Sequence, residues 1–245
     1  MLVSGSKSDK GLLRENNEDS FYVNDKLGVY VLADGMGGHD GGEIASNIVV
    51  QTLGKNISLS LQHRKKDNIE HIVNKALCEA NEEIILLKKE HIELMNMGTT
   101  VVLSVFLDDI AYYSHLGDSR AYLYNKEEDK LLQLTTDDSL VTEMVKRGNI
   151  SKDQLRTHYL RNIVTKYLGM NDLALHDIRN CDFGKGDCIL LCSDGLTSMI
   201  DEREIIAILN ASIAMGPQYA CDSLVYEANN NGGHDNITVI VIQNK

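Results

Sequence analysis

The chain has 245 residues, of which 43% are hydrophobic and 24% charged, with a formal net charge of −12 at pH 7. This charge argues against a nucleic-acid partner, which needs clustered Lys and Arg, and no apolar run reaches the roughly 18 residues that span a bilayer. The five cysteines form no C-x-x-C pair, which is typical of reduced thiols, so we expect a soluble cytoplasmic protein without a membrane partner.

No linker or low-complexity tract divides the sequence, which predicts one domain over residues 1–245. A strand is predicted at about 28–33, followed by two helices at 42–61 and 68–92, each with one apolar face. Three β-rich runs at 99–107, 110–116 and 120–125 are separated by short polar segments, as in an antiparallel meander.

The second half of the chain mixes strands and helices. Residues 138–170 are polar with a helical pattern, in which Ser151 and Gln154 have the spacing of a capping box. Strands are predicted at 173–181, 187–192 and 237–242, and helices at 202–210, capped by Asp201 and Glu204, and at 217–229. Because strands and helices cluster instead of alternating strictly, we predict an α+β layered fold and not a doubly wound parallel sheet.

Four aspartates lie at the ends of predicted strands. Asp34 in "VYVLADG" and Asp194 in "CILLCSDG" each follow an apolar strand and precede a glycine, Asp118 follows "YYSHLG", and Asp235 precedes the last strand. Any single Asp-Gly is explained by a turn, because both residues tolerate the backbone angles that turns need. A hairpin turn should lead into another strand, however, and helix-prone sequence follows Asp34 and Asp194.

If these carboxylates meet, they need a cation. Two bare carboxylates about 4 Å apart repel by roughly 4 kcal/mol at an effective dielectric of 20. Oxygen ligands favour Mg²⁺ or Mn²⁺ over zinc, and a glycine after the aspartate lets a peptide carbonyl approach as a further ligand. Two such ions can activate a shared water and hold a phosphate, so the hydrolysis of a phosphate ester is the natural chemistry.

Other motifs for phosphate chemistry are absent. No Lys-Ser/Thr follows "GMGGHDGGE", as a P-loop requires, and Asp40 stands where a dinucleotide-binding loop needs its third glycine. No cysteine is followed six positions later by Arg, which excludes the usual cysteine phosphatase loop. We interpret His115 as a packed sheet residue and Cys192 as core filler.

Six motifs occur in order along the chain: "RENNEDS" (14–20), "ADGMGGHDGGEIAS" (33–46), "MGTT" (97–100), "GDSRAYL" (117–123), "LLCSDGL" (190–196) and "GGHDNITVIV" (232–241). Together they resemble the motifs of bacterial metal-dependent serine/threonine protein phosphatases, the type-2C or PPM family. The resemblance runs from about residue 5 to 242. It implies a four-layer α-β-β-α sandwich of two antiparallel sheets, with a Mn²⁺ or Mg²⁺ centre at one end.

The resemblance also implies a set of metal ligands. Asp34 would bridge two core ions, the Gly35 carbonyl would bind the second ion, and Asp194 and Asp235 would complete the first. Asp118 with Asp194 resembles the third-metal site of bacterial members.

Further roles around the metals follow from the same resemblance. Arg14 would clamp the substrate phosphate, which suits a planar and permanently charged guanidinium. Glu18 and Asp19 resemble outer-shell carboxylates that hold metal-bound waters, and Asn236 would support Asp235.

The sequence departs from the family pattern at three positions. These departures bear on the identity of the general acid and on substrate preference. Met36 stands where eukaryotic relatives have a histidine, so the general acid is unassigned, with His39 as a candidate. "DDS" at 137–139 replaces the usual D-H-S, and Tyr159 replaces a proline after His158. Both lie within residues 137–170, which resemble the flap beside the active site, so they bear on substrate preference.

The leading hypothesis is a Mn²⁺- or Mg²⁺-dependent phosphoserine/phosphothreonine protein phosphatase in signalling. It would be a monomer that acts on phosphorylated proteins, including a Ser/Thr kinase that it opposes. A catalytically weak module that binds phosphoproteins is the alternative, and a sensor with incidental acidic turns is a third. The ordered motifs are not explained by the sensor, and the retained ligands with Arg14 favour the enzyme, because a scaffold has no need for a repulsive acid cluster.

Overall fold

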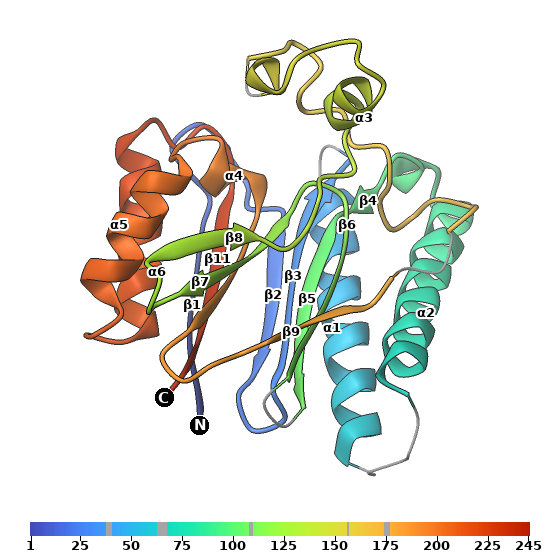
Figure 1. The fold of residues 1–245 in the computed structure, drawn as a ribbon. Coiled ribbons are helices and arrows are strands. Elements are labelled where there is room, and N and C mark those ends of the chain that lie inside the picture. The colour runs from blue at the N-terminus through green and yellow to red at the C-terminus, as the bar shows by residue number, and fades with distance from the viewer. Residues whose placement is uncertain (38–40, 63–67, 108–109, 156, 174–176) are drawn as a thin grey trace.

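The computed structural model describes residues 1–37, 41–62, 68–107, 110–155, 157–173 and 177–245. Two antiparallel sheets pack face to face, and helices cover the outer face of each (Figure 1). One sheet has the order β1 (Leu2–Asp9), β11 (Ile237–Asn244), β10 (Cys188–Cys192), β7 (Arg120–Asn125), β8 (Lys130–Gln133). The other has the order β2 (Asp19–Asn24), β3 (Val29–Met36), β5 (Val101–Leu107), β6 (Ile110–Leu116), β9 (Arg179–Asp182), with β4 (Gly98–Thr99) paired to β3.

Helices form the two outer layers. α1 (Gly41–Gln62) and α2 (Ile69–Glu90) pack on the sheet that contains β3, and α5 (Glu202–Ser212) and α6 (Pro217–Asn230) pack on the sheet that contains β11. The predicted four-layer α-β-β-α sandwich is therefore confirmed. None of the described helices is long and apolar enough to cross a membrane. That residues 1–245 form a single domain stays a prediction.

The interior strands are apolar on both faces because each face is buried. In β3, Tyr30 and Leu32 lie in the core between the sheets, whereas Val29, Val31 and Ala33 pack under α1 and α2. The same alternation holds in β10 and β11, whose opposite faces contribute to the central core and to the core under α5 and α6. This explains why these strands read as continuous apolar runs in the sequence.

The helices predicted at 42–61, 68–92, 202–210 and 217–229 are confirmed as α1, α2, α5 and α6. The cap of α5 is also present, since Asp201 Oδ1 accepts a hydrogen bond from the Glu204 N–H at 2.9 Å and Glu204 Oε2 accepts one from the Asp201 N–H at 2.6 Å. These contacts satisfy amide donors that the first turn leaves free.

The predicted meander is only half right. β5 and β6 pair antiparallel, but β7 lies in the other sheet, where it pairs with β10 and β8. The chain changes sheets at residues 117–119, where Gly117 has a φ of 101° that favours glycine. Asp118 therefore lies at a crossover between the sheets and not in a hairpin turn.

Three of the edge strands are not predicted from the sequence, and the fourth is predicted with the wrong bounds. β1, β2 and β8 had not been predicted, and of the strand predicted at 173–181 only the last part forms β9. All four lie at the edges of their sheets. An edge strand is partly exposed and so lacks the apolar run that marks an interior strand.

Residues 137–170 form an excursion at one end of the molecule, away from both termini (Figure 1). Their predicted helical character is largely wrong, because the described part contains one short helix, α3 (Leu140–Lys146), and a 3₁₀ turn, η2 (Lys152–Gln154). The Ser151 N–H donates to Gln154 Oε1 at 3.0 Å, as the capping spacing predicts, yet only this 3₁₀ turn follows. We call residues 137–170 the flap.

Candidate metal centre

The sheet topology brings the strand-end aspartates to the end of the molecule that carries the flap. Asp34 lies near the end of β3, and the register of β2 with β3 places Asp19 directly opposite it. Asp118 follows β6, Asp194 begins the short helix α4 (Asp194–Thr197) after β10, and Asp235 lies just before β11. Each residue comes from a different strand end, which is why the cluster is dispersed in the sequence.

The electrostatics show that these acids are close to one another. Burial, followed by the charges of Asp19, Asp194, Asp118 and Asp235, raises the pKa of Asp34 well above its ordinary value. Burial and the neighbouring Asp194 raise the pKa of Asp118 to about 8. Burial and Asp235 raise the pKa of Asp194 to about 6. Mutually repelling carboxylates in a buried site call for protons or cations.

Two of the acids, Asp235 and Asp194, have partners within the site. Arg14 Nη2 lies 2.7 Å from Asp235 Oδ2, and Asp194 is hydrogen-bonded to Asp34. Within the described residues no group of three His, Cys, Asp or Glu side chains is already arranged to hold a metal ion.

The residues present nevertheless fit a hard divalent ion. The donors are carboxylate and carbonyl oxygens, which Mg²⁺ and Mn²⁺ prefer. In addition, Asp19 Oδ1 is buried without a hydrogen-bond partner, whereas its other oxygen accepts a bond from Ser193 Oγ at 2.8 Å. A buried carboxylate oxygen without a partner is costly, and a bound ion or its water would satisfy it.

Gly35 lies in a space that admits no side chain. A Cβ at this position would collide with the carbonyl oxygen of Gly42 in the first turn of α1 and lie 2.6 Å from the Glu18 carbonyl oxygen. The Gly35 N–H donates to that same Glu18 oxygen at 3.1 Å. Close packing of three backbone segments therefore requires glycine at this position, and the approach of the Gly35 carbonyl to a metal stays a prediction.

The "MGTT" motif fixes the backbone of Asp34. Thr100 Oγ1 accepts a hydrogen bond from the Asp34 N–H at 3.1 Å, and Thr99 Oγ1 donates to the Asp34 carbonyl oxygen at 2.8 Å. Thr100 Oγ1 also lies 2.7 Å from Ser119 Oγ, beside Asp118. The sequence showed this motif only as part of the resemblance, and its spacing carried no signal for these contacts.

Asn236 contacts Asp235, as predicted, through its backbone, and its side chain has a second role. Asp235 Oδ1 accepts a bond from the backbone N–H of Asn236 at 2.9 Å. The Asn236 side chain instead holds the loop before β2: its Nδ2 donates to the carbonyl oxygens of Lys10 at 3.0 Å and Asn16 at 2.8 Å, and its Oδ1 accepts from the Glu18 N–H at 2.8 Å. Asn236 thereby anchors the loop that carries Arg14.

Arg14 and Glu18 lie at the rim of the acid cluster. The Arg14 side chain is 53% exposed, so part of its guanidinium is accessible beside Asp235. Burial raises the pKa of Glu18, against the lowering effect of Arg14. This arrangement leaves a cationic group at the mouth of an acidic site.

Three further residues, Cys192, His115 and His39, were considered in the sequence analysis. Cys192 is fully buried, and burial raises the pKa of its thiol to about 12, so it is core filler as predicted. His115 packs in β6 and its Nε2–H donates to the Thr136 carbonyl oxygen at 2.8 Å, as expected for a packed sheet residue. His39, the candidate general acid, lies outside the described residues.

The acid cluster opens onto a cavity of about 720 Å³. Asp118 and Asp194 line one part of it, and the flap residues Ser139, Val141 and Arg161 line another. A substrate that reaches the acids from this side would therefore contact the flap.

The sequence of this chain matches the model of a known protein family. The model of the family described as protein phosphatase 2C matches residues 13–220. The chain belongs to the protein phosphatase 2C family. This finding confirms the resemblance and the assignment to an enzyme family, the protein-serine/threonine phosphatases.

Bacterial phosphatases of this family are similar over nearly their whole length. "Serine/threonine phosphatase stp" of Listeria innocua is 35% identical over 240 residues, which are 97% of this chain and 94% of the relative. "Protein phosphatase PhpP" of Streptococcus pneumoniae is 37% identical over 239 residues, 96% and 94% of the two chains. The match therefore includes the flap as well as the sandwich.

Solved structures of the family agree with the fold. The Mycobacterium tuberculosis phosphatase PstP/Ppp has a TM-score of 0.90 at 30% identity, covering 100% of this chain and 99% of that one. A PstP catalytic domain in complex with two manganese ions has a TM-score of 0.87 at 30% identity, covering 99% and 97%. A phosphatase of this fold thus accommodates a manganese pair.

Proposed function

We propose that this chain is a phosphoserine/phosphothreonine protein phosphatase that hydrolyses the phosphate monoester with a metal-activated water. The observation that carries this proposal is the convergence of Asp34, Asp118, Asp194 and Asp235 at one end of the sandwich, beside a cavity. Its substrates are phosphorylated proteins in the cytoplasm, including a Ser/Thr kinase, and the chain acts as a monomer.

Each acid has a place in the proposed centre. Asp34, the Gly35 carbonyl, Asp194 and Asp235 would hold two core ions. Asp118 with Asp194 would hold a third ion. When bound, Mn²⁺ or Mg²⁺ ions lower the pKa of a water molecule and neutralise the charge of the phosphate.

The chain's own residues position the substrate. Arg14 binds the phosphate oxygens, and its neighbours Glu18 and Asp19 orient waters at the centre. Attack of the water oxygen on phosphorus forms one P–O bond and breaks the bond to the Ser or Thr oxygen, which leaves with a proton. Asn236 holds the loop that carries Arg14 through hydrogen bonds to two backbone carbonyls, and so keeps Arg14 close to the phosphate.

The direct test is turnover of a phosphothreonine peptide by the chelator-treated protein, with and without added Mn²⁺ or Mg²⁺. We expect release of inorganic phosphate only when a divalent ion is present, and its loss on addition of EDTA, because each proposed ligand is an oxygen that binds such ions. Binding of the peptide without turnover at any metal concentration would instead support the phosphoprotein-binding module.

Arg14→Ala should raise KM for the phosphothreonine peptide by about tenfold or more, because a charge-assisted contact to the phosphate is lost. Arg14→Lys should recover only part of the affinity, since an ammonium lacks the bidentate fork. Steady-state kinetics, with metal content measured in parallel, distinguish this role from metal binding. Arg179→Ala, an exposed arginine on β9, serves as the control. Unchanged KM and unchanged inhibition by inorganic phosphate in Arg14→Ala would place the clamp elsewhere.

A further inference from the structure

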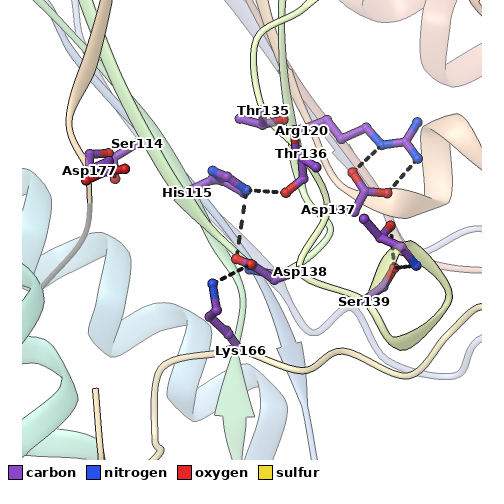
Figure 2. A network of polar contacts seen from close by, with 12 residues as sticks. Ser114, His115, Arg120, Thr135, Thr136, Asp137, Asp138, Ser139, Lys166 and Asp177 are labelled. Atoms are coloured by element: carbon purple, nitrogen blue, oxygen red, sulfur yellow. Dashed lines mark hydrogen bonds and ion pairs between the residues drawn. The ribbon is translucent and has the colours of Figure 1, made fainter. Parts of the chain in front are cut away.

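Asp138, the residue that departs from the family's usual D-H-S, lies where the flap joins the sandwich. Its Oδ1 accepts a hydrogen bond from Lys166 Nζ at 2.8 Å (Figure 2). Its Oδ2 lies 3.8 Å from His115 Nε2 and accepts a longer bond from the Gly117 N–H at 3.4 Å. The carboxylate therefore contacts the end of β6, the turn after it and the far end of the flap.

The backbone of Asp138 joins the same segments. Its N–H donates to the Gly117 carbonyl oxygen at 2.8 Å, and its carbonyl oxygen accepts from the Thr165 N–H at 2.7 Å. One residue thus connects the turn that precedes Asp118 with the segment by which the flap returns to the sandwich.

The Asp138–Lys166 pair differs from an ordinary surface ion pair. The Asp138 side chain is only 15% exposed and that of Lys166 58%, whereas in the flap pair Arg147–Glu143 the two side chains are 75% and 38% exposed. Exposed pairs contribute little because water screens them, and a shielded carboxylate with several donors is held more firmly. Asp137 cannot replace it, since Arg120 binds both of its oxygens at 2.8 and 2.7 Å.

The segments that Asp138 joins lead to the cavity and to the metal centre. Arg161, which precedes Lys166 in the flap, lines the cavity. Leu168, which follows Lys166, forms a β-bridge with Thr99, and the Thr99 hydroxyl donates a hydrogen bond to the Asp34 carbonyl oxygen. On the other side, Gly117 precedes Asp118 directly. The side-chain contacts of Asp138 therefore connect the flap wall of the cavity with the acids, in addition to the backbone bonds.

We propose that Asp138 and Lys166 form a latch that fixes the flap wall of the substrate cavity, and that they are positioning residues for protein substrates. This inference rests on the proposed phosphatase function. A peptide that extends from the acids reaches the flap wall, whereas a small aryl phosphate does not. The latch therefore acts on peptide binding more than on the hydrolysis of small phosphate esters.

The test compares Lys166→Gln, Asp138→Asn, the double variant and the conservative Lys166→Arg. KM and kcat are measured on a phosphothreonine peptide and on p-nitrophenyl phosphate, and chymotryptic cleavage beside the exposed Tyr159 is followed independently of activity. We expect each single variant to raise the peptide KM by about threefold or more, with a smaller change for p-nitrophenyl phosphate and faster cleavage of the flap. The double variant should be no worse than either single variant, because the two act as a pair, and Lys166→Arg should resemble the wild type.

Arg147→Gln is the matched control, because it breaks a flap ion pair that reaches neither Gly117 nor the return segment. Equal effects of Arg147→Gln and Lys166→Gln, additive single variants, or an unchanged peptide KM with unchanged cleavage would each overturn the latch. If Asp138→Asn fails to fold, Lys166→Gln still tests the proposal. Lys166 is 58% exposed, and removal of its ammonium group leaves the backbone hydrogen bonds of Asp138 intact. A wild type without turnover would contradict the proposed function instead, and the cleavage rates would then decide the latch alone.

Discussion

Replacement of Asp34 by asparagine should lower kcat by at least about a hundredfold, because an amide could not serve as the shared anionic ligand that we propose for two ions. The same change should leave the metal-free protein at least as stable as the wild type. Desolvation, followed by the charges of Asp19, Asp194, Asp118 and Asp235, raises the pKa of Asp34, so a neutral asparagine avoids the cost of holding a carboxylate there.

Two measurements check this result: kcat on the phosphothreonine peptide at saturating Mn²⁺, and the melting temperature in EDTA. Asp182→Asn, an exposed aspartate on β9 at the edge of the sheet, is the control for a general loss of negative charge. An Asp34→Asn enzyme with the wild-type kcat would contradict the assignment. A metal-free variant that melts well below the wild type would show that Asp34 stabilises the fold.

Gly35→Ala should lower the free energy of unfolding by about 3 kcal/mol and abolish activity, because overpacking forces the backbone to shift. The added Cβ would collide with the Gly42 carbonyl oxygen and crowd the Glu18 carbonyl oxygen. Both segments border the proposed metal centre, since Gly42 packs against Gly35 and Glu18 precedes Asp19. Urea unfolding of the metal-free protein, followed by circular dichroism, measures the effect.

Gly148→Ala is a useful comparison for this prediction. A Cβ at Gly148 meets nothing within 4 Å, so only the left-handed backbone, with φ of 74°, opposes the alanine, at a cost of about 1 kcal/mol. If Gly35→Ala were no less stable than Gly148→Ala, the space around Gly35 would have to be wider than the structure shows.

The sequence predicts the interior of the fold better than its edges. β3, β10 and β11 have long apolar runs because both of their faces are buried, and α5 has a cap that local spacing reveals. β1, β2 and β8 have one neighbour each and are partly exposed, so their sequences resemble loops. The crossover after β6 was missed because a glycine between two strands reads equally well as a hairpin turn.

The residues of the candidate site, like the strands of the fold, could be predicted from the sequence only in part. The four strand-end aspartates were recognisable because the same apolar strand with a terminal acid recurs along the chain. The contacts around them were not, because Thr100, Ser193 and Asn236 bind Asp34, Asp19 and the loop before β2, which are far away in sequence. No local spacing encodes such contacts, and the same holds for the bond between Asp138 and Lys166.

The most direct test of the metal centre is a calorimetric titration of the chelator-treated protein with Mn²⁺, for the wild type beside Asp34→Asn. If the strand-end aspartates hold the proposed pair of core ions, the wild type should bind at least roughly two ions per chain, and Asp34→Asn should lose most of this binding. Absence of binding by the wild type, or the same stoichiometry and affinity in Asp34→Asn, would contradict the proposal that these acids form a metal centre.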